Sequence, residues 1–179
     1  MSRQDCRLLI VDVQDKLVPA IPVAETLIYN CRRLIQGAGI LGVPVSATEQ
    51  YPKGLGHTIG ELKELIGEAP DKVRFSCAEV LNWGSAAEEP DSRDQVVVAG
   101  MEAHVCVLQT ALDLLAQGYR VYVAADAVGS RSKLDWKIAL DRLSACGAVV
   151  TTTESVLFEW CETAGSPEFR QISKLIQGK

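Results

Sequence analysis

Residues 96–106 read Val96-Val-Val-Ala-Gly-Met-Glu-Ala-His-Val-Cys106, an apolar run that is followed at once by a helical pattern. A short apolar run that ends in glycine is typical of a buried strand, and the residues after Gly100 predict a turn into a helix. Cys106 then falls near the start of that helix. The unpaired N–H groups and partial positive charge of a helix N-terminus favour a thiolate there and an oxyanion beside it. The segment is therefore typical of a nucleophile, although a buried structural cysteine fits the same position.

Strand and helix patterns alternate along the rest of the chain. We expect strands over residues 7–13, 43–48, 71–75, 95–99, 120–125 and 147–151. Periodicity predicts helices over residues 61–66, 102–117, 133–145 and 167–176, and another that starts near residue 24 and is closed by the glycines from position 37 onward. Residues 51–60 and 85–93 are expected as a loop and a surface connection. This alternation predicts one α/β domain over residues 1–179, a doubly wound, mostly parallel sheet with helices on both faces in a Rossmann-like three-layer sandwich.

Composition and charge exclude several classes of protein. The chain has 179 residues, of which 47% are hydrophobic, and a net charge of −5 with acidic and basic residues mixed. It lacks the basic stripe with interleaved aromatic residues that nucleic-acid binding needs, and its apolar runs have strand length, so we expect neither a nucleic-acid partner nor a membrane span. Its six cysteines are spread out without a CxxC pair. Since no signal peptide is visible, we expect reduced thiols and a cytoplasmic location.

The expected fold brings two distant residues to one crevice. In open α/β sheets, ligands bind beyond the carboxyl ends of the strands, where the strand order reverses. The first strand and the strand that begins at Gln95 are expected as central neighbours. Asp12 ends the first of them, and Cys106 lies just beyond the second. The alternatives are a turn-forming aspartate and an inert buried thiol.

Lys72 lies in the weakest of the expected strands, and an exposed strand lysine is its plainest interpretation. It gains a role if it points into the crevice, because an ammonium group offsets the like charge that an aspartate imposes on a thiolate. Lowering a thiol pKa by about two units requires about 2.7 kcal/mol, whereas a helix N-terminus supplies about 0.3–1 kcal/mol. A lysine, or a general base that removes the proton during attack, must supply the remainder.

The two histidines suit neither a catalytic base nor a metal site. On a regular helix the side chains of His104 and Cys106 diverge by about 200°. His57 lies in the loop Tyr51-Pro-Lys-Gly-Leu-Gly-His57 and has no second histidine at metal-ligand spacing. Phosphate-binding glycine motifs are absent as well. We therefore expect no cofactor and no metal ion.

Five short motifs follow one another along the chain. They are Asp12-Val-Gln-Asp-Lys-Leu17, Thr48-Glu-Gln-Tyr-Pro-Lys-Gly-Leu-Gly56, Lys72-Val-Arg-Phe-Ser76, Gly100-Met-Glu-Ala-His-Val-Cys-Val107 and Ala125-Asp-Ala-Val-Gly-Ser-Arg131. Each motif is weak alone, but the ordered set resembles the isochorismatase-like cysteine hydrolase superfamily over residues 7–158. The resemblance is to the metal-lacking, uncharacterised branch of that superfamily, which is related to the nicotinamidases.

The resemblance implies a six-stranded parallel sheet and a catalytic triad. Asp12 would be the general base, Lys72 its electrostatic partner and Cys106 the nucleophile. It also implies a cis peptide bond between Glu102 and Ala103, just before the nucleophile. The oxyanion hole would then consist of the backbone N–H groups of Cys106 and Ala103.

The implied reaction is hydrolysis of a C–N, amide-type bond of a small molecule through a thioester. The segment Thr48-Glu-Gln-Tyr-Pro52 lacks the Asp-x-His pair of metal-binding nicotinamidases, and a cysteine nucleophile disfavours isochorismate itself. Substrate contacts are expected from residues near the crevice, namely Gln14, Gln50, Tyr51, Phe75 and His104. Relatives of this kind imply a homo-oligomer.

Two other functions remain open from the sequence. A catalytically inactive, oligomeric binding or scaffold protein would share the same fold. A redox sensor would pair Cys106 with Cys77 or Cys146, although no resolving pair is visible in the sequence.

Overall fold

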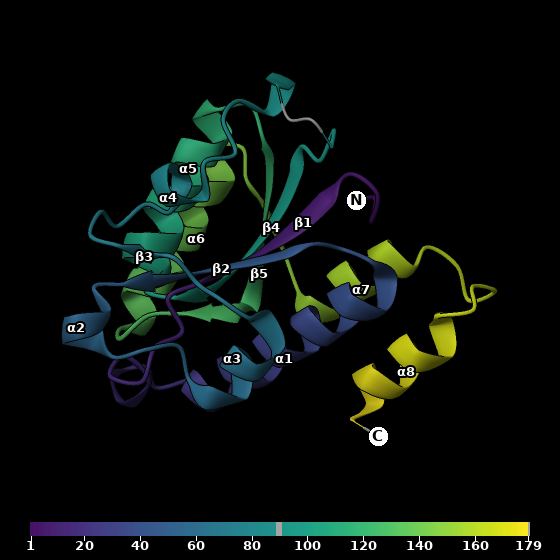
Figure 1. The fold of residues 1–179 in the computed structure, drawn as a ribbon, viewed down its shortest axis with the longest axis horizontal. Helices are drawn as coiled ribbons and strands as arrows, with labels where there is room; N and C mark the ends of the chain where they lie inside the picture. Colours follow the sequence, from purple (N-terminus) through teal and green to yellow (C-terminus); the bar gives the residue numbers. More distant parts are fainter. Residues whose placement is uncertain (89–90, 179) are drawn as a thin grey trace.

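A sheet of parallel strands forms the centre of the molecule (Figure 1). The computed structural model describes residues 1–88 and 91–178. Among these residues the sheet has six strands in the order β3-β2-β1-β4-β5-β6. The strands are β1 (Cys6–Val11), β2 (Val45–Gln50), β3 (Asp71–Lys72), β4 (Gln95–Met101), β5 (Arg120–Gly129) and β6 (Val149–Thr151). The order reverses between β1 and β4, which places a ligand crevice beyond their carboxyl ends.

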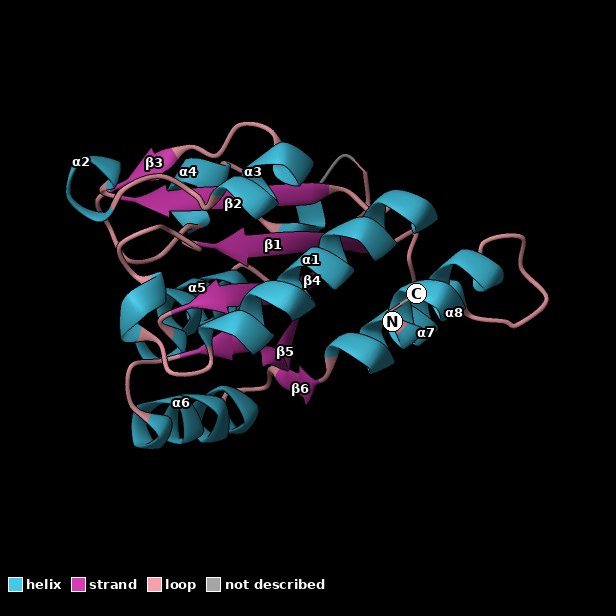
Figure 2. Ribbon diagram, turned by 90° about the horizontal axis from the view of Figure 1, so that it is seen from below, coloured by secondary structure: helices cyan, strands magenta, loops and turns pink. Residues whose placement is uncertain are grey.

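Helices cover both faces of the sheet (Figure 2). One face is covered by α1 (Ala24–Leu41), α3 (Gly60–Ile66), α7 (Thr153–Cys161) and α8 (Phe169–Gln177). The other face is covered by α4 (Ala78–Leu81), α5 (Leu108–Ala116) and α6 (Lys133–Ala145). Short pieces complete the chain, namely 3-10 turns at Val18–Ala20 and Ala86–Glu88, the helix α2 (Pro52–Leu55) and a π-helical segment at Ala103–Val107. The expected three-layer α/β architecture is therefore confirmed.

The two central strands are buried throughout, because helices cover both of their faces. Every residue of β1 and of β4 is buried, as expected for parallel strands inside a sandwich. Val11 pairs with Gly100 at their carboxyl ends. Gly100 has a φ of +134°, and a β-carbon there would meet the backbone of Val11. Only glycine permits this close approach, which brings the residues after β1 and β4 side by side.

Helices α1 and α7 differ from the sequence prediction. Helix α1 continues through Gly37 to Leu41 and ends at Gly42, which has a φ of +71°. A β-carbon on Gly37 would meet the side chain of Leu157 in α7, so the glycine allows close helix packing instead of ending the helix. Helix α7 itself was not predicted, and its position against α1 is a long-range contact that local periodicity does not encode.

Two connections also differ from prediction, and a third adds detail to it. Strand β3 stops at Lys72, although the pattern predicted a strand over residues 71–75. The segment predicted as a loop over residues 51–60 contains the short helix α2. In the surface connection, a 3-10 turn occupies Ala86–Glu88, and residues 89–90 lie outside the described part of the chain. No helix in the described ranges is long and apolar enough to cross a membrane.

Candidate functional site

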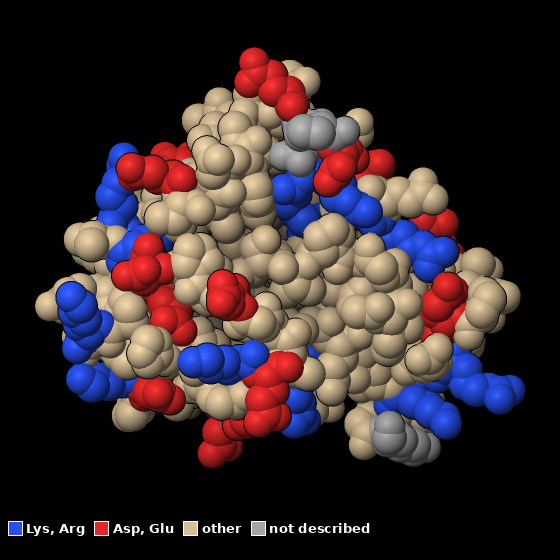
Figure 3. Space-filling view, in the orientation of Figure 1, with Lys and Arg blue, Asp and Glu red and all other residues tan. Residues whose placement is uncertain are grey.

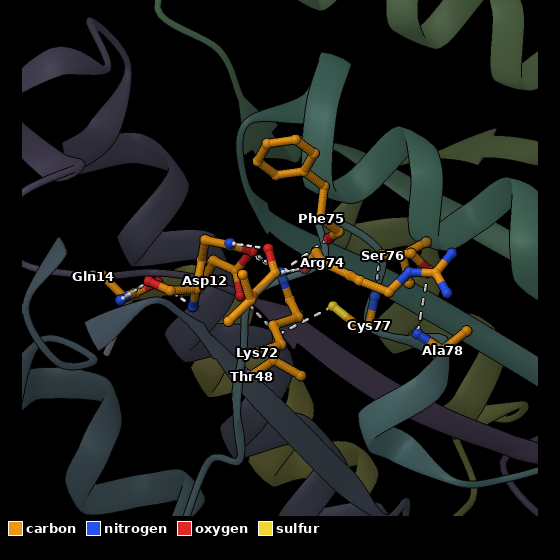
Figure 4. A network of polar contacts seen from close by, with 12 residues as sticks. Asp12, Gln14, Thr48, Lys72, Arg74, Phe75, Ser76, Cys77 and Ala78 are labelled. Atoms are coloured by element: carbon orange, nitrogen blue, oxygen red, sulfur yellow. Dashed lines mark hydrogen bonds and ion pairs between the residues drawn. The ribbon is translucent and has the colours of Figure 1, made fainter. Parts of the chain in front are cut away.

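Asp12 lies at the carboxyl end of β1, at the centre of a buried polar network (Figure 4). Its backbone has a φ of +52°, so the chain turns sharply as the strand ends. The carboxylate is fully buried. Its Oδ2 accepts a hydrogen bond of 2.7 Å from Lys72 Nζ, and its Oδ1 accepts one of 2.8 Å from Thr48 Oγ1. The aspartate therefore does more than form a turn, because strands β1, β2 and β3 all contribute to its environment.

Lys72 is buried beside Asp12, and its side chain is 1% exposed. Besides Asp12, its ammonium group donates to Gln50 Oε1 at 2.6 Å and to the carbonyl oxygens of Phe75 at 2.9 Å and Arg74 at 3.3 Å. These carbonyls explain why β3 is short, since the backbone after Lys72 turns back to face its own side chain. An ammonium group held by acceptors in this way fixes the orientation of the carboxylate.

Cys106 completes the group. It lies in the π-helical segment after β4, is 4% exposed and hydrogen-bonds the Asp12 carboxylate. Burial raises the pKa of the Cys106 thiol, and the charge of Asp12 raises it further, against an opposing effect of Lys72. Burial likewise raises the pKa of the Asp12 carboxyl, although Lys72 opposes that shift. The resting thiol therefore keeps its proton, and the Asp12 carboxyl lies beside it.

The turn before Cys106 differs from the expectation drawn from the resemblance. The peptide bond between Glu102 and Ala103 is trans, since the described residues contain no cis peptide bond. The turn is made instead by Glu102, which has left-handed backbone angles with φ +57° and ψ +62°. Its carbonyl oxygen accepts from the N–H groups of Val105 and Val107 at 2.9 and 3.3 Å. A left-handed glutamate followed by a π-helical turn reverses the chain without isomerising the peptide bond.

Two side chains just after β5 hold this turn. The buried Glu102 carboxylate accepts two hydrogen bonds from Arg131, at 3.0 Å from Nε and 3.3 Å from a terminal nitrogen. His104 Nδ1 lies 3.0 Å from Ser130 Oγ, so this half-buried histidine faces the end of β5 and not the thiol. Sequence reasoning did not identify Ser130 or Arg131 as site residues, although Arg131 ends one of the quoted motifs.

The predicted substrate contacts fall into two groups. The side chains of Gln14 and Gln50 are buried and bound within the protein. Gln14 bridges to the Gln50 backbone in both directions, at 2.7 and 3.0 Å, and Gln50 contacts Lys72 and the Val73 carbonyl. Tyr51 and Phe75 are 54% and 50% exposed. The backbone N–H of Tyr51 donates to the Lys72 carbonyl, and the Phe75 carbonyl accepts from Lys72 Nζ. The two rings therefore face solvent, whereas the two amides are held by partners within the protein.

A second thiol lies in the same network. Cys77 is fully buried, and its Sγ is 3.2 Å from Thr48 Oγ1, the group that donates to Asp12. Its backbone N–H donates to Thr110 Oγ1, one helical turn beyond Cys106. Burial raises the pKa of Cys77 to about 11, so it is a neutral thiol near pH 7. It packs against the polar network around Asp12 without access to solvent.

His57, which follows β2 in the chain, lies against a carboxylate. His57 Nδ1 lies 2.9 Å from Glu49 Oε2, and the other Glu49 oxygen accepts from the backbone and hydroxyl of Thr58. Within residues 1–88 and 91–178, no three histidine, cysteine or acidic side chains are grouped so as to hold a metal ion. A metal site built from this segment has too few ligands among the described residues.

Several known proteins are similar to this chain in sequence and in structure. A family model described as the isochorismatase domain matches residues 6–155. Isochorismatase domain-containing protein 1 of Salmo salar is 44% identical over 168 residues, which cover 93% of this chain and 59% of that protein. The chain thus spans less than two thirds of the length of that relative. The solved structure of MAR1 ribonuclease from Caenorhabditis elegans superposes with a TM-score of 0.91 at 38% identity, covering 99% of this chain and 92% of that one.

A more distant structure shares the fold. The YcaC gene product of Escherichia coli, described as an octameric hydrolase of unknown specificity, has a TM-score of 0.80 at 23% identity and covers 99% of this chain and 96% of its own. The family match over most of the chain confirms the resemblance that the five motifs suggested. The chain therefore belongs to the isochorismatase family.

Proposed function

We propose that this protein is a cysteine hydrolase that cleaves a C–N, amide-type bond of a small molecule through a thioester on Cys106. One observation carries the proposal: a buried aspartate, fixed by a buried lysine, hydrogen-bonds a thiol at the switch point of the sheet. A buried ion pair contributes little to stability, because desolvation of both charges opposes folding. We infer that this pair has a functional role, which is to accept the proton of the Cys106 thiol.

The proton moves with the reaction. As Sγ of Cys106 attacks the carbonyl carbon, ionised Asp12 takes the thiol proton. Lys72 stabilises the carboxylate before Asp12 takes the proton and again once Asp12 has given it up. Asp12 then gives this proton to the leaving nitrogen as the C–N bond breaks. In the second half, water attacks the thioester, Asp12 accepts a proton from it, and that proton passes to the departing sulfur.

The oxyanion is proposed to bind the backbone N–H groups of Ala103 and Cys106. Ala103 is fully buried, and its N–H makes no hydrogen bond to any other residue in the described ranges. Buried N–H groups without a partner are rare, and one placed beside a nucleophile suits a charge that appears only during the reaction. Glu102 fixes the direction of this N–H through the left-handed turn.

The site suits a small substrate. Cys106, Asp12 and Lys72 are all buried in the isolated chain, so only a compact group can reach the sulfur. We propose that the exposed rings of Tyr51 and Phe75 contact substrate, and that Gln14 and Gln50 position Lys72. An apolar cavity of about 380 Å³ at the end of β5 has Ser130 in its wall but none of the three proposed catalytic residues. We therefore do not assign the substrate to it.

We further propose that residues 1–179 act as one hydrolase domain, without a cofactor, in a cytoplasmic homo-oligomer. The octameric state described for YcaC and the free thiols at all six cysteines support this proposal. A nucleic-acid substrate, which the name of the Caenorhabditis elegans protein raises, is not favoured here. The net charge is −5, and acidic and basic side chains are interspersed on the face in Figure 3.

Acylation of Cys106 is the direct test. The protein is incubated with a panel of small amides and imides, quenched with acid and weighed by intact-protein mass spectrometry. We expect turnover of at least one compound and an acyl adduct that maps to Cys106. Cys106→Ala should lose both, whereas Cys146→Ala, which removes an exposed thiol, should keep both.

Two outcomes would contradict the proposal. Amide turnover by Cys106→Ala rules out the thioester route. A complete lack of adduct and turnover across the panel, with a small molecule still bound, favours the inactive binding protein. RNA cleavage that is lost in Cys106→Ala would instead move the substrate to nucleic acid.

A further inference from the structure

Helix α6 is apolar on two opposite faces. Its inner face places Ala139, Leu140 and Leu143 in the core against the sheet. Its outer face carries Leu134 and Ile138, one turn apart, which are 67% and 48% exposed. In Figure 2 the helix forms the margin of the molecule. A surface helix normally has one apolar face, so a second one indicates a partner.

Charged residues border this outer face in a self-complementary pattern. With a rotation of about 100° per residue, Asp135 and Arg142 lie along one side of the Leu134–Ile138 stripe. Lys137 and Asp141 lie along the other side, 2.6 Å apart. All four charged side chains are exposed. Each side therefore carries one acid and one base, spaced symmetrically about residues 138–139.

This symmetry selects one kind of occupant. When two copies of a helix pack antiparallel across a two-fold axis, each flank meets the same flank of the other copy in reverse order. Asp135 would then face the partner's Arg142, and Lys137 would face the partner's Asp141. Ile138 would pack near the axis against the partner's Ile138. A parallel pair would instead place Asp135 near the partner's Lys137 and Arg142 near the partner's Asp141, and the mixing experiment below tells the two arrangements apart.

We propose that α6 pairs with α6 of a second copy of this chain, antiparallel across a two-fold axis, an inference that rests on the homo-oligomer proposed above. The helix is about 20 Å long, so it forms the centre of a larger interface. Burial of Leu134 and Ile138 drives the association, and the flanking charges are complementary across the antiparallel contact.

The pairing bears on the active site as well. The inner side of α6 packs against the π-helical segment that carries Cys106. Ser130 and Arg131, just before α6, contact His104 and Glu102 of the nucleophile turn. A second copy held on the outer face therefore restricts the helix that supports this turn.

The first experiment measures mass in solution by light scattering and sedimentation. The wild-type protein is compared with Ile138→Glu and with Leu65→Glu, which alters an equally apolar and 41% exposed residue on α3. We expect the wild-type oligomer to fall to half its mass or less in Ile138→Glu and to persist in Leu65→Glu. Circular dichroism confirms that both variants are folded.

The second experiment reverses charges beside the proposed contact and leaves Leu134 and Ile138 unchanged. Asp135→Arg and Arg142→Asp each place like charges opposite one another, and each should raise the dissociation constant at least tenfold at low salt. In a 1:1 mixture, a chain with Asp135→Arg and a chain with Arg142→Asp are complementary at both contacts, so the mixed oligomer should re-form. High salt should reduce the differences.

The outcomes separate the two proposals. A monomeric wild-type protein overturns both the homo-oligomer and the α6 pairing. A wild-type oligomer whose mass is unchanged in Ile138→Glu, with no gain on mixing the charge variants, overturns the α6 pairing alone. Neither result affects the hydrolase proposal, which the acylation of Cys106 tests separately.

Discussion

The candidate site of this protein is centred on a buried ion pair with a thiol beside it. Asp12 and Lys72 are separated by sixty positions in sequence and by 2.7 Å in space. Their side chains are each 1% exposed, so neither charge has access to water. Burial raises the pKa of Cys106, so the resting site holds a protonated thiol beside the Asp12 carboxyl. A slow reaction of Cys106 with general thiol reagents would therefore not argue against catalysis.

Removal of the lysine should separate stability from activity. We expect Lys72→Met to abolish turnover and to lower the free energy of unfolding by about 3–5 kcal/mol at pH 7, because Asp12 is left as an uncompensated buried charge. The loss of stability should be smaller at acidic pH, where a proton neutralises the Asp12 carboxyl. The double variant Lys72→Met with Asp12→Asn should recover much of the stability and none of the activity. Urea unfolding and amide turnover measure the two quantities.

The pH dependence should report Asp12. Its pKa is raised by burial, and the ionised form is the base, so kcat/KM should fall on the acidic side at a higher pH than an ordinary carboxyl of pKa about 3.9 would give. The folded state also binds this proton more tightly than the unfolded chain does. The stability contributed by this group is thus full at low pH and lost as pH rises through the folded pKa. An acidic limb at or below the ordinary value would contradict the assignment of Asp12.

At the scale of elements, the connection between β4 and α5 decides how the sulfur is presented. A left-handed Glu102 and a π-helical segment replace a regular helix start, so the simple picture of a thiol on an α-helix N-terminus does not apply. Left-handed backbone at a non-glycine residue is strained and persists only where surrounding contacts hold it. Here the contacts are the two hydrogen bonds from Arg131 to the Glu102 carboxylate.

Loss of these bonds should loosen the turn. We expect Arg131→Met to lower kcat about tenfold, with little change in KM, since the turn positions reacting groups and not the bound substrate. Arg131→Lys should retain one contact to Glu102, and its kcat should lie between those of the wild type and Arg131→Met. Arg32→Met, which removes another exposed arginine with a longer 4.0 Å ion pair, should behave as wild type. An unchanged kcat in Arg131→Met would remove the turn from the mechanism.

At the scale of the whole molecule, strand order brings the site together. β1, β2, β3 and β4 each end at the same edge of the sheet, and together they contribute Asp12, Thr48, Lys72 and the turn to Cys106. The group needs no external ion to define its geometry, because each charged atom has a partner from the chain. The chemistry proposed for it uses one proton that passes between sulfur, carboxylate, nitrogen and water.

Metal chelation should accordingly leave turnover unchanged. We expect full activity after prolonged treatment with EDTA or phenanthroline followed by removal of the chelator, because the proposed mechanism assigns no step to a metal. Activity is measured before and after, with and without added zinc, iron or manganese. Loss of activity that a metal restores would require ligands beyond Glu49 and His57 and would revise the mechanism.

The sequence determined the framework of this protein. Continuous apolar runs predict buried parallel strands, and this placed Asp12 and Cys106 correctly at the ends of two central neighbours. The motifs identified the family. These features are local, since periodicity and turn chemistry depend on residues close together in the chain.

Only the tertiary structure decided the state of the site. Lys72 reads as an exposed lysine until the carbonyls that surround it are known, and Gln14 and Gln50 read as substrate ligands until their partners are seen. The trans turn at Glu102, the continuation of α1 through Gly37 and the outer face of α6 are likewise set by contacts between distant segments. Burial, charge pairing and backbone strain arise from such contacts, and no local pattern of residues specifies them.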